Sequence, residues 1–133
     1  MSEHEHSVFS DKQFAQVEAY VHDIQRLVGL GNWKLHVTNH APDKQDAYAQ
    51  SDIGEVGMDC YLSFAQDFLE LDPTQQRETI LHEMMHMWLQ HLFGDYELSL
   101  SHDAAVLLRR QAERVVDGLA CAMAPLLPLP KWT

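Results

Sequence analysis

Two histidines and a glutamate in the segment "LHEMMHMW" have a spacing that suits metal chemistry. His82, Glu83 and His86 stand in the order H-E-x-x-H. Side chains four residues apart share one face of an α-helix, so both imidazoles can bind one zinc ion about 2.0–2.1 Å from each nitrogen. Glu83 lies one position further round the helix, where its carboxylate can take a proton from a water molecule on the metal. The motif therefore predicts a zinc site with a general base beside it.

A histidine-rich helix without a metal is the alternative interpretation. The chain contains nine histidines, which makes a chance occurrence of the motif less rare than usual. However, the motif falls in an otherwise apolar stretch, where imidazoles and a carboxylate without partners are costly to bury. This context favours the metal site.

The third zinc ligand must come from another part of the chain. Leu92 occupies the position where the extended metzincin motif has its third histidine. In "AERVVDGLA", Glu113 and Asp117 lie four residues apart, so Glu113 could bind the metal while Asp117 accepts a hydrogen bond from a ligand histidine. A solvated acidic stripe beside neighbouring arginines is the alternative. The rival ligands are His91, His102 and Cys121.

The segments "LHEMMHMW" and "AERVVD" together resemble the gluzincin branch of zinc metallopeptidases, and the order of elements is similar to that of the minigluzincins. The resemblance implies a small zinc endopeptidase of zincin-like fold, in which Glu83 passes a proton from the attacking water to the leaving amine. It implies His82, His86 and Glu113 as zinc ligands, Glu83 as general base and Asp117 as their supporting residue.

The resemblance leaves the oxyanion stabiliser open. Larger gluzincins carry a histidine or tyrosine for this purpose in a downstream domain, for which this chain has no room. Tyr96 and His102 are the candidate substitutes, with His91 as a further one. SprT-like proteases are the second resemblance, but their third ligand is a histidine in a glycine-containing segment, a pattern that "LSLSHD" lacks.

The expected elements are three helices and a small three-stranded sheet, an α+β arrangement. Ser10 and Gln13 form a capping box for a first helix that ends at Gly29. The segments "WKLHVTNH", "AYAQSDI" and "DCYLSFA" have the composition or alternation of strands. The resemblance to gluzincins implies that the last of them, which precedes the motif helix, forms the rim of the cleft and pairs with substrate. Asp72 and Pro73 predict the start of the motif helix, which would run from 73 to 93.

Ser101 is expected to cap the last helix, which Pro125 ends. The predicted organisation is a flexible tail at 1–9, one zincin-like metallopeptidase domain at 10–124 and an extended tail at 125–133. That last segment could block the cleft of its own or a neighbouring molecule, or could pack as a simple strap. We therefore expect a monomer, or a weak oligomer formed through this tail.

The composition of the chain limits the classes of molecule that it is expected to bind. A net charge of −11 without a basic cluster argues against direct contact with nucleic acid, and we find neither a secretory signal nor a membrane span. Cys60 and Cys121 are expected to be buried, reduced thiols. These features predict a cytoplasmic enzyme that acts on a peptide or protein.

Two other functions compete with a zinc endopeptidase. A zinc-stabilised binding module without catalysis would close the metal site with a fourth protein ligand, for which His102 and Cys121 are the candidates. A SprT-like protease would act on DNA-associated proteins, but the acidic charge counts against it.

Overall fold

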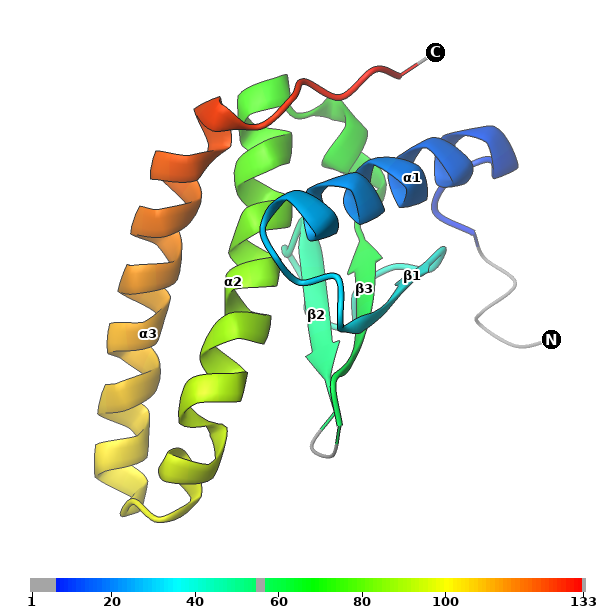
Figure 1. Cartoon of the computed structure of the whole chain (residues 1–133). Helices are drawn as coiled ribbons and strands as arrows, with labels where there is room; N and C mark the ends of the chain where they lie inside the picture. Colours follow the sequence, from blue (N-terminus) through cyan, green and yellow to red (C-terminus); the bar gives the residue numbers. More distant parts are fainter. Residues whose placement is uncertain (1–6, 55–56, 133) are drawn as a thin grey trace, which may run out of the picture.

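The computed structural model describes residues 7–54 and 57–132, and the side chains of these residues except those of 91–98. The described residues form an α+β arrangement of three α-helices and one small mixed sheet, as expected (Figure 1). In chain order the helices and strands are α1 (Asp11–Leu27), β1 (Lys34–Thr38), β2 (Ala49–Ile53), β3 (Asp59–Phe64), α2 (Pro73–Leu98) and α3 (His102–Met123). Short 3₁₀ turns precede α2 (Gln66–Glu70) and follow α3 (Ala124–Leu126).

The capping signals fixed the starts of α1 and α3. The Ser10 hydroxyl accepts the Gln13 N–H while the Gln13 side chain accepts the Ser10 N–H, which confirms the capping box. The Ser101 hydroxyl accepts the Ala104 N–H at 3.3 Å. Beyond α1 the chain turns at Gly29, whose positive φ of 80° favours glycine.

The sheet has the strand order β1-β3-β2, with β1 parallel and β2 antiparallel to β3. The sequence interpretation placed "DCYLSFA" at the rim, but this segment is the central strand β3, paired on both sides. Strand β2, from "AYAQSDI", is the edge strand beside α2. The order could not be read from three short strands, because a parallel neighbour such as β1 need not be the next strand in sequence.

One core joins the sheet to all three helices. Alternate residues of β3, Cys60, Leu62 and Phe64, are 0–1% exposed and pack with residues of α1 and α2. Helix α2 is central, because it packs against β2 on one side and α3 on another (Figure 1). The motif helix is therefore held from two directions.

Helix α2 continues past the predicted stop at Gly94 and ends at Leu98. A glycine inside a helix costs about 1 kcal/mol relative to alanine, which the rest of a 26-residue helix tolerates. A short turn joins α2 to α3, and α3 runs back along α2 (Figure 1).

The C-terminal segment packs as a strap across the start of α2 and the side of α1. The Tyr20 hydroxyl donates a hydrogen bond to the Pro128 carbonyl at 2.7 Å, and the Trp132 indole donates to the Gln76 side chain at 3.0 Å. Arg77 donates to the Leu127 carbonyl at 3.0 Å.

The described end of the predicted N-terminal tail is also fixed, since Phe9 is 4% exposed and exchanges two hydrogen bonds with Asn39. Residues 1–6 of that prediction lie outside the described part. Of the two cysteines, Cys60 is buried as expected, but Cys121 is exposed on α3. Cys121 falls outside the buried side of α3, which Val116 and Ala120 form.

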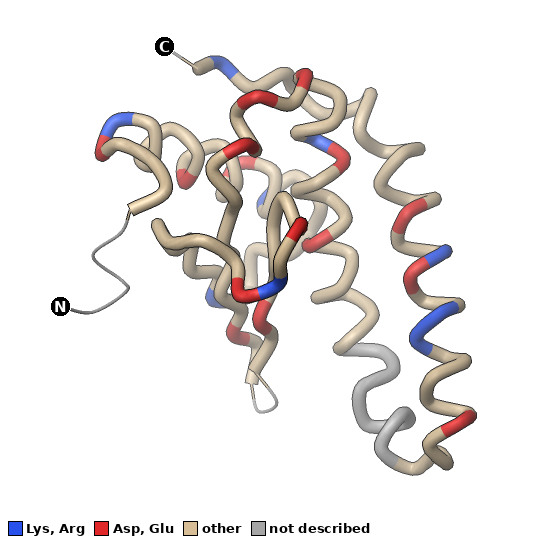
Figure 2. Tube along the Cα trace, turned by 180° about the vertical axis from the view of Figure 1, so that it is seen from behind, with Lys and Arg blue, Asp and Glu red and all other residues tan. Residues whose placement is uncertain are grey.

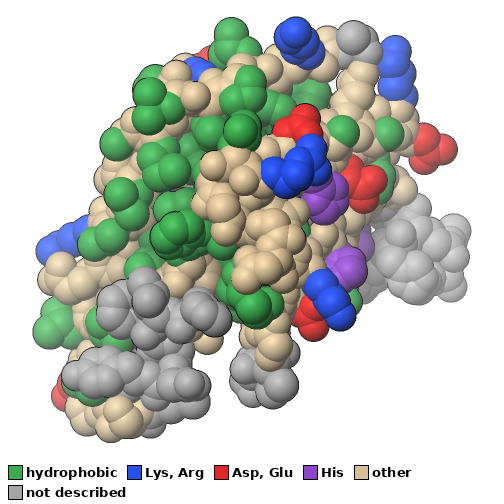
Figure 3. All heavy atoms as spheres, in the orientation of Figure 1, with side chains coloured by type: hydrophobic (Ala, Val, Ile, Leu, Met, Phe, Trp, Pro, Cys, Tyr) green, Lys and Arg blue, Asp and Glu red, His purple; other side chains and the backbone are tan. Residues whose placement is uncertain are grey.

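The surface carries few cations and some apolar residues. Lysines and arginines are scattered rather than gathered on one face (Figure 2), in agreement with the absence of a basic cluster in the sequence. Exposed apolar side chains gather over α3 (Figure 3). Its exposed large apolar residues are Leu107, Val115 and Leu119. Within the described ranges, no helix has the length and apolar character needed to cross a membrane.

Candidate metal centre

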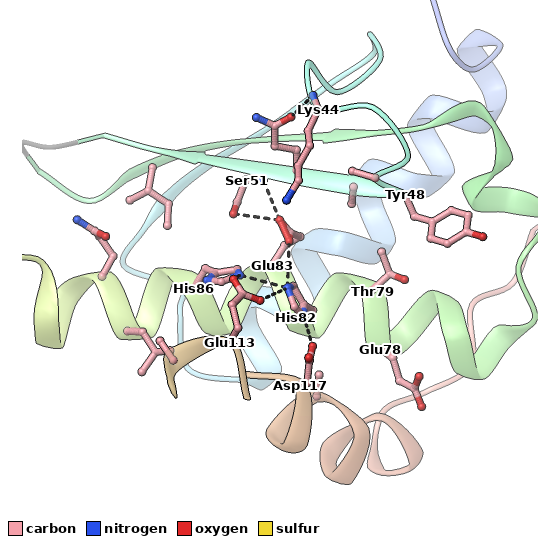
Figure 4. Close-up of a pocket in the computed structure, with 18 of the residues that line it drawn as sticks. Lys44, Tyr48, Ser51, Glu78, Thr79, His82, Glu83, His86, Glu113 and Asp117 are labelled. Carbon is pink, nitrogen blue, oxygen red and sulfur yellow. Dashed lines mark hydrogen bonds and ion pairs between the residues drawn. The ribbon is translucent and has the colours of Figure 1, made fainter. Parts of the chain in front are cut away.

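A pocket of about 820 Å³ lies over the middle of α2, between the edge strand β2 and α3 (Figure 4). The loop before β2 closes one side, where Lys44 and Tyr48 line the pocket. The pocket is rich in acidic and imidazole groups, and His82, Glu83 and His86 form its floor.

Three side chains from two helices converge in this pocket. The Nε2 atoms of His82 and His86 are 3.2 Å apart. Glu113 reaches across from α3 and places its carboxylate oxygens 3.4 Å from His82 Nε2 and 3.1 Å from His86 Nε2. One ligand atom from each of the three lies within 4.8 Å of the others, so the group could hold a metal ion.

Asp117 orients one of the two imidazoles. One of its carboxylate oxygens lies 2.8 Å from His82 Nδ1, within ion-pair distance. A proton held on Nδ1 leaves Nε2 of the neutral ring with a free lone pair, and this is the atom that faces His86 and Glu113. Glu113 and Asp117 share a face of α3 because they lie one turn apart. Helix α3 thus supplies both a potential ligand, Glu113, and a carboxylate in contact with a second potential ligand, His82.

Glu83 is the buried acid of the site, with an exposed fraction of 8%. Its Oε1 accepts hydrogen bonds from the Ser51 N–H at 2.9 Å and the Ser51 hydroxyl at 3.2 Å, while its Oε2 lies 3.9 Å from His82 Nε2. Burial raises the pKa of Glu83, and the neighbouring His82 and His86 and the Ser51 hydrogen bonds oppose that rise. The carboxylate therefore stands beside the imidazoles without using Nε2 of either as its main partner.

Two of the other residues considered from the sequence, His102 and Cys121, lie apart from this cluster. His102 is exposed in the first turn of α3 and does not line the pocket, and Cys121 lines the pocket two turns beyond Glu113 without joining the cluster. The side chains of His91 and Tyr96 lie outside the described residues. Among the described side chains, the candidate oxyanion role predicted for His102 has no support.

Two pocket residues were missed by sequence reasoning. Ser51 contacts Glu83 from 32 positions earlier in the chain. Lys44 points toward Glu83 from the loop before β2, and its N–H donates to the Gln50 side chain at 3.0 Å (Figure 4). The approach of Ser51 and of Lys44 to Glu83 depends on β2 lying beside α2, and neither residue belongs to a motif. Only a correct prediction that β2 is the edge strand beside α2 could have indicated these two residues.

Comparisons of the chain with protein-family models, with curated proteins and with solved structures found no match. The geometry of the pocket therefore carries the functional argument.

Proposed function

We propose that this protein is a small zinc-dependent peptidase with a gluzincin-like site and a zincin-like fold. The observation that carries the proposal is the convergence of His82, His86 and Glu113, with the buried carboxylate of Glu83 beside them. An isolated H-E-x-x-H motif can occur by chance. The motif does not require Glu113 and Asp117 to approach it from a separate helix, so their approach is independent support for the proposal.

The spacing of the two imidazole nitrogens supports a tetrahedral zinc ion. Ligand atoms about 2.0–2.1 Å from a tetrahedral centre lie about 3.3–3.4 Å from one another. The two Nε2 atoms are 3.2 Å apart, while Glu113 approaches His86 Nε2 with Oε1 at 3.1 Å and His82 Nε2 with Oε2 at 3.4 Å. With one ligand atom taken from each residue, the three atoms lie within 4.8 Å of one another. Two imidazoles and a carboxylate are also the ligand set of many catalytic zinc sites, which keep their fourth position open.

The chain's own residues divide the work of peptide hydrolysis. A bound zinc ion would polarise the scissile carbonyl and lower the pKa of a water molecule. Glu83 would accept the proton of the attacking water and deliver it to the leaving amine. Asp117 would keep His82 in the tautomer that binds metal, and the pocket walls would hold the peptide.

The edge strand β2 is the proposed docking site for the peptide main chain. It lines the pocket, and β3 is its only neighbour among the described strands, although the Ser51 N–H on its other side already donates to Glu83. An extended peptide could add to this side and pass over the cluster. We therefore propose that β2 forms the rim of the cleft, the role that the sequence analysis expected for the segment of β3.

A non-catalytic binding module is the alternative, and it requires a fourth protein ligand. Among the described residues the cluster contains three ligands and includes neither His102 nor Cys121. Inhibition by the C-terminal tail is likewise not favoured, since none of the described residues 125–132 lines the pocket. We propose a cytoplasmic enzyme acting on peptides or proteins without nucleic acid.

The test is cleavage of a diverse peptide mixture by the full chain loaded with one equivalent of zinc, followed by mass spectrometry. Glu83→Gln should abolish cleavage while zinc remains bound, because the variant keeps the ligands and loses the base. Glu78→Gln is the matched control: Glu78 lines the same pocket on the same helix but lies outside the cluster. Its activity should stay close to that of the unaltered protein.

Two results would count against the proposal. Tight zinc binding without cleavage by the unaltered chain would favour the binding module. Absence of zinc binding, measured by competition with a chelator, would remove the metal site altogether.

A further inference from the structure

Ser51 makes two hydrogen bonds to a single oxygen atom of Glu83. The backbone N–H lies 2.9 Å and the hydroxyl 3.2 Å from Oε1. Both groups donate, so this oxygen is held by two donors from one residue while the other oxygen, Oε2, faces the metal-ligand side, 3.9 Å from His82 Nε2. The serine therefore holds the carboxylate in an orientation that directs its other oxygen at the cluster.

The position of Ser51 in the sheet explains why both donors are available. Strand β2 is at the edge, and its residues alternate between pointing their N–H groups toward β3 and away from it. The Ser51 N–H goes to Glu83 instead of to a strand, and its side chain leans the same way over α2 (Figure 4). Glu83 thus fills a place on the strand edge where another strand's carbonyl could have bonded.

We propose that Ser51 is a positioning residue for Glu83, which couples the peptide-binding edge strand to the general base. This inference rests on the proposed peptidase function. With Oε1 anchored, the carboxylate cannot rotate freely, and Oε2 stays directed at the place where the attacking water would lie. Ser51 does not touch the reacting atoms, so it acts only through Glu83.

Kinetics of zinc-loaded variants test this role, with a peptide that the unaltered chain cleaves as the substrate. Ser51→Ala removes the hydroxyl donor and keeps the backbone donor, so kcat should fall about tenfold while KM and zinc affinity stay within about twofold. Ser51→Thr keeps both donors and should restore kcat. Ser63→Ala is the matched control, because Ser63 on β3 pairs with Gln50 and presents its side chain to the other face of the sheet.

An unchanged kcat in Ser51→Ala would overturn the proposal, as would a loss explained by KM or by weaker zinc binding. A fall that Ser51→Thr fails to restore would also contradict it.

Hydrogen exchange of the Ser51 amide gives a readout that does not need activity. In the unaltered chain this amide should exchange slowly, and in Glu83→Ala it should exchange at least about tenfold faster, because its acceptor is gone. The amides of the central strand β3 serve as an internal reference. Equal Ser51 exchange in both proteins would show that the contact does not exist. If the unaltered chain cleaves no peptide, the proposed function and the catalytic role fail together, whereas the exchange experiment still decides the contact.

Discussion

At the scale of single residues, the carboxylate of Asp117 combines high exposure to solvent with a close contact to His82. Two thirds of its side chain is open to solvent, yet one oxygen lies 2.8 Å from His82 Nδ1. An exposed ion pair of this kind contributes little to folding. In the proposed metal site, Asp117 would act on the tautomer of the imidazole, and thus on metal affinity.

Asp117→Asn is expected to weaken zinc binding about 10–100-fold, because the amide no longer favours a proton on His82 Nδ1. Chelator competition with the purified chain measures this change. Asp103→Asn makes the same chemical change in the first turn of the same helix and should leave zinc affinity unaltered. Equal affinities in all three proteins would show that Asp117 does not support the site.

The two thiols should differ sharply in reactivity. Burial, followed by the nearby charges of Glu83 and Asp52, raises the pKa of Cys60 to about 12, whereas Cys121 is exposed. A thiol reagent should modify one cysteine of the folded chain quickly and the second only on unfolding. Cys121→Ser should remove the fast reaction. A fast reaction that persists in this variant would mean that Cys60 is accessible.

At the scale of elements, the sequence predicted what local chemistry determines. Ser10 and Ser101 cap their helices through contacts within three residues, and His82 and His86 share a face because of helix periodicity. The failures concern non-local features. The order of the strands, the end of α2 beyond Gly94 and the contact of Ser51 with Glu83 depend on packing between distant segments. Glu113 was predicted as a ligand candidate because a catalytic zinc site needs a third protein ligand besides the two histidines.

The strap formed by the C-terminal segment should loosen at alkaline pH. Tyr20 is 8% exposed, and burial raises its pKa to about 12. The neutral hydroxyl donates to the Pro128 carbonyl, and a phenolate could not. Because the folded pKa exceeds the unfolded value of 10.0, this stability is complete below pH 10 and is lost as the pH rises toward 12.

Between pH 8 and pH 11 the loss should be about 1.4 kcal/mol for Tyr20 alone. Urea denaturation at both pH values measures it, and Tyr20→Phe supplies the comparison because phenylalanine does not ionise. The unaltered chain should lose about 1.4 kcal/mol more than the variant over this range. Equal losses would mean that Tyr20 ionises normally in the folded protein.

At the scale of the whole molecule, zinc should stabilise the fold. The proposed ligands belong to α2 and α3, so the ion would join two helices that pack against each other. Free zinc at one hundred times its dissociation constant should raise the free energy of unfolding by about 2.7 kcal/mol. Denaturation with and without zinc measures this increase, which should persist in Glu83→Gln and vanish in His86→Ala.

A stabilisation retained by His86→Ala would place the bound zinc elsewhere. His4 and His6 could bind zinc adventitiously, so the experiment should be repeated with a chain that begins at Ser7.

The division of the cluster between two helices links metal affinity to helix alignment. Sliding α3 by one residue shifts it about 1.5 Å and turns it about 100°. Such a shift would carry Glu113 away from the imidazoles without breaking either helix. The buried face of α3 is built from Ala105, Val116 and Ala120, whose small side chains allow close approach. If the proposed site binds zinc, its affinity would report on the register of α2 and α3, and substitutions at this contact that touch no proposed ligand would change it.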